Sequence, residues 1–262
     1  MRALGTSALV VAAIYLGLLA LIWWAQERLI FLPAKLPAEH RFNFGADVHE
    51  VWIDVPGARM HALHLRNKAP RGVVFYLHGN AGNLESWFSN ADLYRGLNLD
   101  LFMLDYRGYG KSGGHIDSQA QLEADVRAAW AAVAARYAGA KHVIVGRSLG
   151  SALAAGLAAE LQPELTLLIS PYESMSAMAA EHYRWVPQAL LRYPLRTDEA
   201  LARVRSPVLL VHGERDELIS PRHSERLRLV APHAELVLIR GAGHNDLQDF
   251  PQYLEAIAAR LR

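Results

Sequence analysis

Short apolar runs recur along the chain, and segments with helical spacing separate them. Six runs have the length and the apolar composition of buried strands. These runs cover residues 73–77, 101–104, 143–145, 165–169, 208–211 and 236–239. Helical patterns lie between most of them, for example at residues 222–229 and 252–260. Strands that alternate with helices predict an α/β fold, with a mostly parallel sheet covered on both faces.

An earlier stretch has a different period. Residues 48–55 alternate as in a half-buried strand. One face carries His49, Val51, Ile53 and Val55, and the other carries Val48, Glu50, Trp52 and Asp54. Residues 60–65 are expected to form a second strand. Pro56 and Gly57 between them are typical turn residues. We therefore predict an antiparallel hairpin ahead of the parallel strands.

The N-terminal segment has a third pattern, because no charged residue occurs from Ala3 to Ala25. About 20 apolar residues in a helix span a bilayer, and Trp23 and Trp24 end the stretch as an interfacial aromatic belt would. We predict an uncleaved membrane anchor over residues 1–28 and a single-pass membrane protein. A cleaved signal peptide is disfavoured because bulky residues stand where small ones precede a cut. A buried core helix is the remaining alternative.

The side of the membrane stays open. Arg2 precedes the apolar stretch, and Arg28, Lys35 and Arg41 follow it, which slightly favours a cytoplasmic catalytic domain. A domain on the outside is equally compatible with the sequence. The apolar strip 29–33 that follows the anchor either lies in the membrane interface or docks on the domain.

The remaining residues, 29–262, suit one catalytic domain with a sizeable core, since 52% of the chain of 262 residues is apolar. Lys and Arg number 27 and Asp and Glu 26, for a net charge of +1, so we expect no nucleic-acid partner. The absence of cysteine excludes disulfides, thiolate metal sites and a thiol nucleophile.

One region interrupts the alternation of strands and helices. Residues 175–196 are rich in Met, Tyr, Trp and Leu. Two interpretations stay open at this point. The region is either a helix that packs in the core, or a small cap of about residues 173–200 that covers the active site and is lined for an apolar substrate.

The candidate chemistry begins where the strand at residues 143–145 ends. Gly146, Ser148 and Gly150 form a G-x-S-x-G pattern between that strand and a helix rich in alanine. A serine on so sharp a turn has a strained backbone, and side chains two residues away on either side would collide with neighbouring elements. We predict that Ser148 is a nucleophile.

A serine nucleophile needs an imidazole as base and a carboxylate that orients the imidazole. Asp216 and His244 each follow a predicted strand downstream of Ser148, in the chain order Ser, Asp, His. Asp105 also ends a strand, but it precedes the serine, and we expect it to form an ion pair with Arg107. His212 is expected to be a hydrogen-bonded structural residue.

The oxyanion that forms during acyl transfer needs backbone N–H donors. The loop at residues 78–83 follows a predicted strand and contains two glycines, which allow its backbone to approach a ligand. We predict that the backbone N–H groups of Asn80 and Leu149 form the oxyanion hole.

Taken together, these motifs resemble those of the α/β-hydrolase superfamily, and within it the membrane-anchored serine hydrolases of the ABHD type. The matching segments are HGNAGN (78–83), DYRGYGKSG (105–113), GRSLG (146–150), HGERD (212–216) and GAGHND (241–246), with the strip at 29–33. The resemblance implies the α/β-hydrolase fold, with a mostly parallel sheet of eight strands. It also implies Ser148 as nucleophile, Asp216 as acid and His244 as base.

The sequence therefore predicts a membrane-anchored serine hydrolase that cleaves carboxylic esters through an acyl-enzyme. An apolar cap and a membrane anchor favour an acyl or lipid-like ester as substrate. We expect no metal ion and no organic cofactor to take part. A thioesterase, a peptidase with the same triad and a non-catalytic scaffold on a hydrolase fold are the alternatives.

Overall fold

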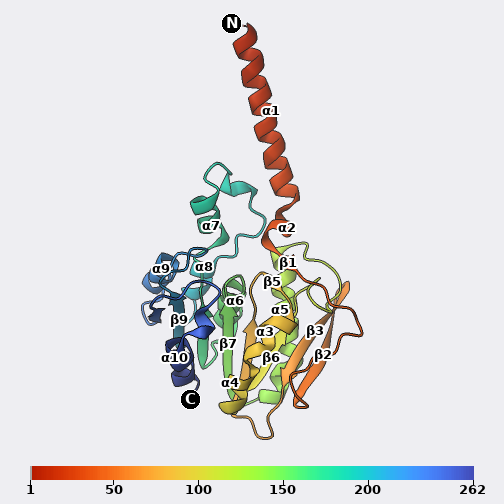
Figure 1. The fold of residues 1–262 in the computed structure, drawn as a ribbon, viewed down its shortest axis with the longest axis vertical. Coiled ribbons are helices and arrows are strands. Elements are labelled where there is room, and N and C mark those ends of the chain that lie inside the picture. The colour runs from red at the N-terminus through yellow and green to blue at the C-terminus, as the bar shows by residue number, and fades with distance from the viewer. Residues whose placement is uncertain (1) are drawn as a thin grey trace.

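A sheet of eight strands forms the centre of the structure, a computed structural model that describes residues 2–262, with side chains from Thr6 onward. The strand order is β10-β9-β8-β7-β4-β6-β3-β2 (Figure 1). Neighbouring strands from β10 to β6 are parallel, while β2 and β3 are antiparallel. The strands are β2 (Val48–Val55), β3 (Ala58–Leu65), β4 (Gly72–Leu77), β6 (Asp100–Leu104), β7 (Lys141–Arg147), β8 (Leu165–Ile169), β9 (Val208–Gly213) and β10 (Glu235–Ile239).

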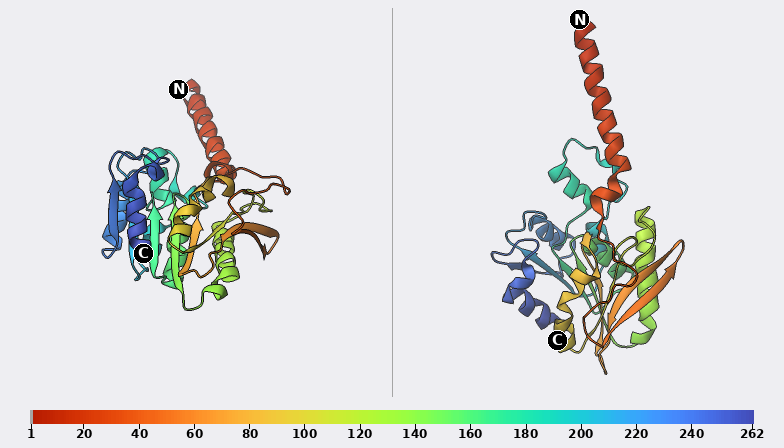
Figure 2. Two further views of the ribbon diagram at one scale, coloured as in Figure 1. Left: turned by 60° about the horizontal axis from the view of Figure 1, so that its bottom comes forward. Right: turned by 45° about the vertical axis from the view of Figure 1, so that its right-hand side comes forward.

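Helices cover both faces of this sheet, as Figure 2 shows. Strand β4 explains why, because Val73 and Phe75 point into one hydrophobic cluster while Val74 and Tyr76 point into the other. The first cluster includes residues of α5, α6, α8 and α9, and the second includes residues of α3, α4 and α10. These helices are α3 (Leu84–Trp87), α4 (Ala91–Gly96), α5 (Gln119–Ala134), α6 (Gly150–Leu161), α8 (Thr197–Leu201), α9 (Arg222–Val230) and α10 (Pro251–Leu261).

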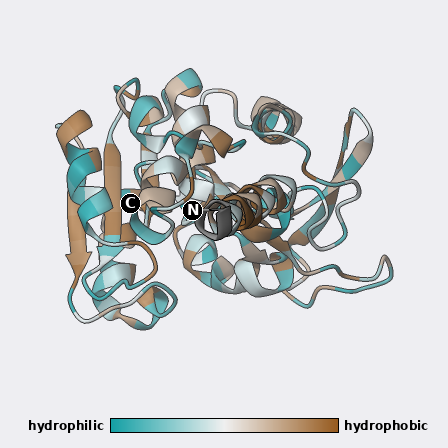
Figure 3. Cartoon of the chain, turned by 90° about the horizontal axis from the view of Figure 1, so that it is seen from above, coloured by the Kyte–Doolittle hydropathy of each residue, from teal (hydrophilic) through white to brown (hydrophobic). Residues whose placement is uncertain are grey.

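Helix α1 (Arg2–Trp24) projects from the body of the domain (Figure 1). Its segment Thr6–Trp24 has 19 residues and a mean hydropathy of 2.2, which is long and apolar enough to cross a membrane. Signal sequences share that property. Figure 3, which looks along α1, shows apolar colouring around the helix, and Leu9, Leu16 and Trp24 are more than 60% exposed.

The strip after α1 docks on the domain, which settles the question left open by the sequence. Helix α2 (Gln26–Ile30) leads into β1 (Leu32–Pro33), and β1 pairs in parallel with β5 (Ala81–Gly82). The Leu32 N–H donates to the Asn80 carbonyl over 2.8 Å. This second, two-stranded sheet joins the N-terminal segment to the loop after β4.

The Met- and aromatic-rich region leaves the body of the domain and rises beside α1 (Figure 1). Its helix α7 (Met175–His182) has no buried residue, although Met175 and Met178 lie partly buried against the hydrophobic core, so α7 lies at the edge of that core and not within it. The base of the region is fixed to α2, because Arg192 forms an ion pair with Glu27 over 2.7 Å and the Tyr193 hydroxyl donates to the same carboxylate.

Candidate active site

A tight turn joins β7 to α6 and carries Ser148 in the left-handed region, with φ of 53°. A Cβ on Gly146 would lie 2.4 Å from the Gly150 carbonyl oxygen, and a Cβ on Gly150 would lie 2.1 Å from the Leu77 carbonyl oxygen. Both positions therefore exclude a side chain. The physical reason given for the two glycines in the sequence agrees with the geometry of the turn.

Three side chains predicted from the sequence lie within hydrogen-bond distance of one another. The His244 Nε2 atom is 3.1 Å from the Ser148 Oγ atom, and the His244 Nδ1 atom is 2.7 Å from the Asp216 Oδ2 atom. All three residues follow strands at the carboxyl edge of the parallel sheet, where ligands of such sheets bind. The geometry matches that of a nucleophile, a base and an orienting acid.

The Asp216 carboxylate is surrounded by donors. Its Oδ1 atom accepts the backbone N–H groups of Leu218 and Ile219, at 3.0 and 2.8 Å, and its Oδ2 atom lies 3.2 Å from the His212 Nε2 atom. Burial alone would raise the pKa of Asp216, but the hydrogen bonds from His212, His244 and Ile219 outweigh it and hold that pKa well below its usual value. Because the carboxylate is ionised, it accepts a hydrogen bond from the N–H group at His244 Nδ1, and the unprotonated Nε2 is left free to accept a proton.

His212 fits its predicted structural role, since its two ring nitrogens lie 2.7 Å from the Ser224 hydroxyl and 2.8 Å from the Ile219 carbonyl. It also has a contact that the sequence analysis missed, because it faces the Asp216 carboxylate.

The loop that carries His244 is held from two sides. A Cβ on Gly213 would lie 2.4 Å from the Ala242 carbonyl oxygen, so the loops after β9 and β10 come into close contact. On the other side, the Arg147 guanidinium donates to the His244 carbonyl over 3.0 Å and lies 5.4 Å from the centre of the Trp87 ring. Sequence reasoning missed Arg147 and Trp87, because neither belongs to a pattern that marks such a role.

The loop predicted to form the oxyanion hole lies against the turn of Ser148. A Cβ on Gly79 would be 3.5 Å from the Ser148 Cβ and 2.9 Å from the Trp87 ring. The carbonyl of Asn80 accepts hydrogen bonds from the Leu32 N–H and from the Tyr109 hydroxyl, at 2.8 and 2.7 Å. The structure thus brings Gly79, the residue before Asn80, close to Ser148.

A second Asp–His pair lies behind this loop. The expected ion pair between Asp105 and Arg107 is wrong, because Arg107 pairs with Asp125 of α5 over 2.8 Å. Asp105 instead faces His78, with 3.6 Å between Oδ1 and Nε2, and it accepts only the Leu84 N–H. Burial raises the pKa of Asp105 to about 8, which the Leu84 N–H only partly offsets, and burial lowers the pKa of His78 to about 4. Burial thus favours the neutral form of both groups.

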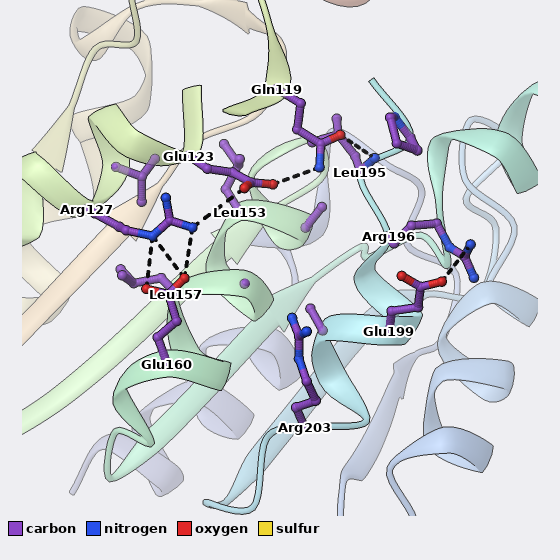
Figure 4. A pocket seen from close by; sticks show the side chains of 15 residues that line it. Gln119, Glu123, Arg127, Leu153, Leu157, Glu160, Leu195, Arg196, Glu199 and Arg203 are labelled. Carbon is purple, nitrogen blue, oxygen red and sulfur yellow. Dashed lines mark hydrogen bonds and ion pairs between the residues drawn. The ribbon is translucent and has the colours of Figure 1, made fainter. Parts of the chain in front are cut away.

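A surface cavity of about 260 Å³ lies between α5, α6 and α8, on another part of the molecule (Figure 4). Ser148, Asp216 and His244 are not among its lining residues. Its charged side chains largely pair with one another, as Arg127 does with Glu160 at 2.9 Å and Arg196 with Glu199 at 2.9 Å. We assign this cavity no role in the chemistry. Among the residues whose side chains the structure describes, no cluster of His, Asp and Glu could hold a metal ion.

Comparison with known proteins shows the family and the fold of this chain. The family model for "Serine aminopeptidase, S33" matches residues 68–196. An uncharacterized protein of Mycobacterium tuberculosis is 33% identical over 259 residues, which cover 95% of this chain and 91% of the relative. The α/β-hydrolase domain-containing protein 17C of Xenopus tropicalis is 33% identical over 214 residues, 79% of this chain and 67% of the relative. Among solved structures, the Pyrococcus furiosus esterase Pf2001 superposes with a TM-score of 0.69 at 18% identity, covering 88% of this chain and 97% of the esterase.

Proposed function

Because this chain belongs to the α/β-hydrolase family and resembles its ABHD-type members, we propose that it hydrolyses carboxylic esters through a triad of Ser148, His244 and Asp216. The observation that carries the proposal is the chain of contacts from the Ser148 Oγ atom to the Asp216 carboxylate, 3.1 and then 2.7 Å long. An ionised Asp216 fixes the tautomer of His244 that can accept the serine proton.

The reaction follows from these contacts. The Ser148 Oγ atom attacks the acyl carbonyl while its proton passes to His244 Nε2. The backbone N–H groups of Asn80 and Leu149 donate to the oxyanion of the tetrahedral intermediate. His244 then protonates the leaving alcohol, and a water activated by the same imidazole releases the acid from the acyl-enzyme. Side chains and backbone of this chain serve every step without a metal or cofactor.

The substrate class is proposed from the surroundings of the site. We propose that residues 1–28 anchor the chain in a membrane as a single span and that residues 29–262 form the catalytic domain. The loop of Asn80 is bonded to β1, directly after α2, so the site lies at the edge of the domain from which α1 departs. With residues 173–200 as a cap beside that edge, an acyl or lipid-like ester is the substrate that this arrangement favours.

The experiment compares wild-type protein with Ser148→Ala, first by labelling with a fluorophosphonate and then by turnover of p-nitrophenyl esters of increasing chain length. We expect labelling and turnover to disappear in Ser148→Ala and to persist in Ser89→Ala, a substitution of an exposed serine. A folded wild-type protein that does not label would contradict the proposed triad. Equal turnover of short, medium and long esters would contradict the lipid-like substrate.

Hydrolysis of an amide is the alternative that one observation favours, because the matching family model is described as a serine aminopeptidase. The same triad attacks esters, thioesters and amides, and they differ in the leaving group that His244 protonates. Parallel assays with an aminoacyl amide, an acyl thioester and the matched oxygen ester decide among them. Ester turnover at least tenfold above amide turnover, compared as kcat/KM, is expected.

A further inference from the structure

The segment after α7 lies beside α1 (Figures 1 and 2) and then returns to the domain, where Tyr193 and Leu195 are buried. Near its base, the Arg192 guanidinium lies 5.2 Å from the centre of the Trp23 ring. Farther along α1, the Tyr15 hydroxyl donates to the Trp185 carbonyl over 2.8 Å, and the two aromatic rings are 6.5 Å apart. We call residues 183–187 the tip loop.

These two contacts measure how far the tip loop reaches along α1. Tyr15 and Trp23 are eight residues apart, and a helix rises about 1.5 Å per residue, so Trp185 lies about 12 Å beyond the level of Trp23. Tyr15 falls in the middle of the apolar segment Thr6–Trp24. If Trp23 and Trp24 mark the membrane interface, the level of Trp185 is inside the hydrocarbon layer.

The side chains of the tip loop suit that environment. Tyr183 is 58% exposed and Trp185 49% exposed, so no part of the described chain covers them fully. Arg184 is the only charged residue from Tyr183 to Leu191, and its long stem allows the guanidinium to extend toward the headgroups. A loop of a water-soluble surface would carry more polar side chains.

Several polar backbone groups of the tip loop have hydrogen-bond partners within the protein. The N–H groups of Tyr183 and Val186 donate to carbonyls of the same segment, at 2.7 and 2.9 Å, and Pro187 has no N–H. The Trp185 carbonyl accepts from Tyr15, whose hydroxyl would otherwise be a polar group in the middle of an apolar span. Lipid penalises unpaired polar groups, and this hydrogen bond removes one from each partner.

The nearest acidic residue turns away from the tip loop. Glu181, at the end of α7, lies 3.3 Å from the His223 ring and 3.9 Å from the Arg226 guanidinium, both on α9. The negative charge is thus directed to the body of the domain. At the base of α1, Arg192 forms an ion pair with Glu27, and the Arg28 guanidinium lies 5.1 Å from the centre of the Trp24 ring.

We propose that the tip loop is a second membrane-inserted element, which enters the same bilayer as α1 and rests against it there. Its partner is the hydrocarbon of the lipid layer, not another protein. The proposal rests on the membrane anchorage proposed for α1 but not on the triad or the ester substrate. Together, α1 and the tip loop would hold the domain at two points.

The test measures depth in the bilayer with the full-length protein in phosphatidylcholine vesicles. Because the chain has no cysteine, a single cysteine at each chosen position takes one environment-sensitive fluorophore. Trp185→Cys reports on the tip loop, Ala12→Cys on the middle of α1, and Trp52→Cys on β2, far from α1 in the sheet. Trp52 is 39% exposed and so matches Trp185 in residue type and accessibility. Tyr183→Cys is a second report on the tip loop.

Nitroxide groups on the lipid acyl chains are expected to quench the fluorophore at Trp185→Cys at least half as strongly as at Ala12→Cys, and not at Trp52→Cys. Circular dichroism checks that each variant is folded. Quenching at Ala12→Cys without quenching at residues 183 and 185 overturns the tip-loop proposal and leaves the anchor standing. A blue-shifted tip-loop signal that lipid nitroxides do not quench also overturns it, since protein would then cover the loop. No quenching at Ala12→Cys overturns both the anchor and the tip loop, whatever the ester assays show.

Discussion

Two Asp–His pairs lie at the same edge of the sheet, and they are in opposite states. Asp216 and His244 are 2.7 Å apart, and the pKa of Asp216 is held well below its usual value. Asp105 and His78 are 3.6 Å apart, and burial raises the pKa of Asp105 to about 8. Both carboxyl groups follow strands of the parallel sheet, so position in the fold does not explain the difference.

The number of donors that face each carboxyl group does explain it. Asp216 has two backbone N–H groups and two imidazole rings around it, whereas Asp105 has the single N–H of Leu84. Burial disfavours the charged form of both carboxyl groups. At Asp216, hydrogen bonds to the carboxylate offset this effect and lower the pKa. A buried aspartate beside a histidine is therefore a catalytic candidate only when its donors keep it ionised.

The largest expected effect comes from removing the charge of the ionised pair. Asp216→Asn should lower kcat by about 10³–10⁴-fold, because an amide stabilises the wrong tautomer of His244 and does not stabilise its cation. Turnover of a short p-nitrophenyl ester measures this loss. A loss in kcat of less than about tenfold would show that Asp216 does not orient His244. The different pKa shifts of Asp216 and Asp105 would then have no bearing on catalysis.

The next effect is the pH dependence of stability. The folded chain keeps the Asp105 proton up to about pH 8, whereas an unfolded chain releases it near pH 4. Between these values Asp105 binds one proton more in the native state, so its contribution to the free energy of unfolding should fall as pH rises, by up to about 1.4 kcal/mol per pH unit. The lowered pKa of His78 contributes in the opposite direction from about pH 4 to 6.5, so the Asp105 contribution is read from the difference between wild type and variant. Denaturant unfolding of wild type and Asp105→Asn, at several pH values in one detergent, measures it. The free energy of unfolding of wild type minus that of the variant should fall as pH rises from about 4 to 8, and parallel curves would contradict a neutral Asp105.

A smaller effect is expected from removing the acceptor of the neutral pair. Asp105→Leu leaves the buried Leu84 N–H without an acceptor, which should cost about 1–3 kcal/mol of stability at pH 7. Asp105→Asn keeps an acceptor for that N–H and serves as the matched control. Thermal unfolding of both variants compares them. If the two lose the same stability, the Leu84 contact is not the cause.

The smallest expected effect is that of Asp105→Asn on kcat. Asp105→Asn should change kcat by no more than about threefold, because a neutral acid and an amide are similar in size and neither is charged. The ester assay used for Asp216→Asn provides the direct contrast. A loss as large as that of Asp216→Asn would mean that Asp105 is charged during the reaction.

The same comparison shows which parts of the site the sequence could predict. Ser148, Asp216 and His244 were predictable because each follows an apolar run, and the glycines around Ser148 are a local requirement of the turn. The strands were predictable for the same reason, and β8 (Leu165–Ile169) matches its prediction at both ends. Burial and tight turns can be predicted from the pattern of neighbouring residues in the sequence.

Contacts between distant segments were not predictable in this way. Arg107 stands two residues from Asp105, yet it pairs with Asp125, which lies within α5. Nothing near Trp185 in the sequence indicates Tyr15, which is 170 residues away. Such partners depend on how helices and strands pack against one another. The propensity and spacing of residues within one segment do not predict this packing.

The pairing of β1 with β5 changes how the enzyme would meet its substrate. Only the short helix α2 separates Trp24 from Leu32, and Leu32 is hydrogen-bonded to the loop beside the serine. With α1 in a bilayer, no flexible linker would separate the domain from the membrane helix. Ser148 would therefore stay at a fixed height above the lipid. Its search would then be two-dimensional. Turnover of a lipid ester should fall when inert lipid lowers the mole fraction of that ester in the vesicle, and it should be unchanged when buffer dilutes the vesicles.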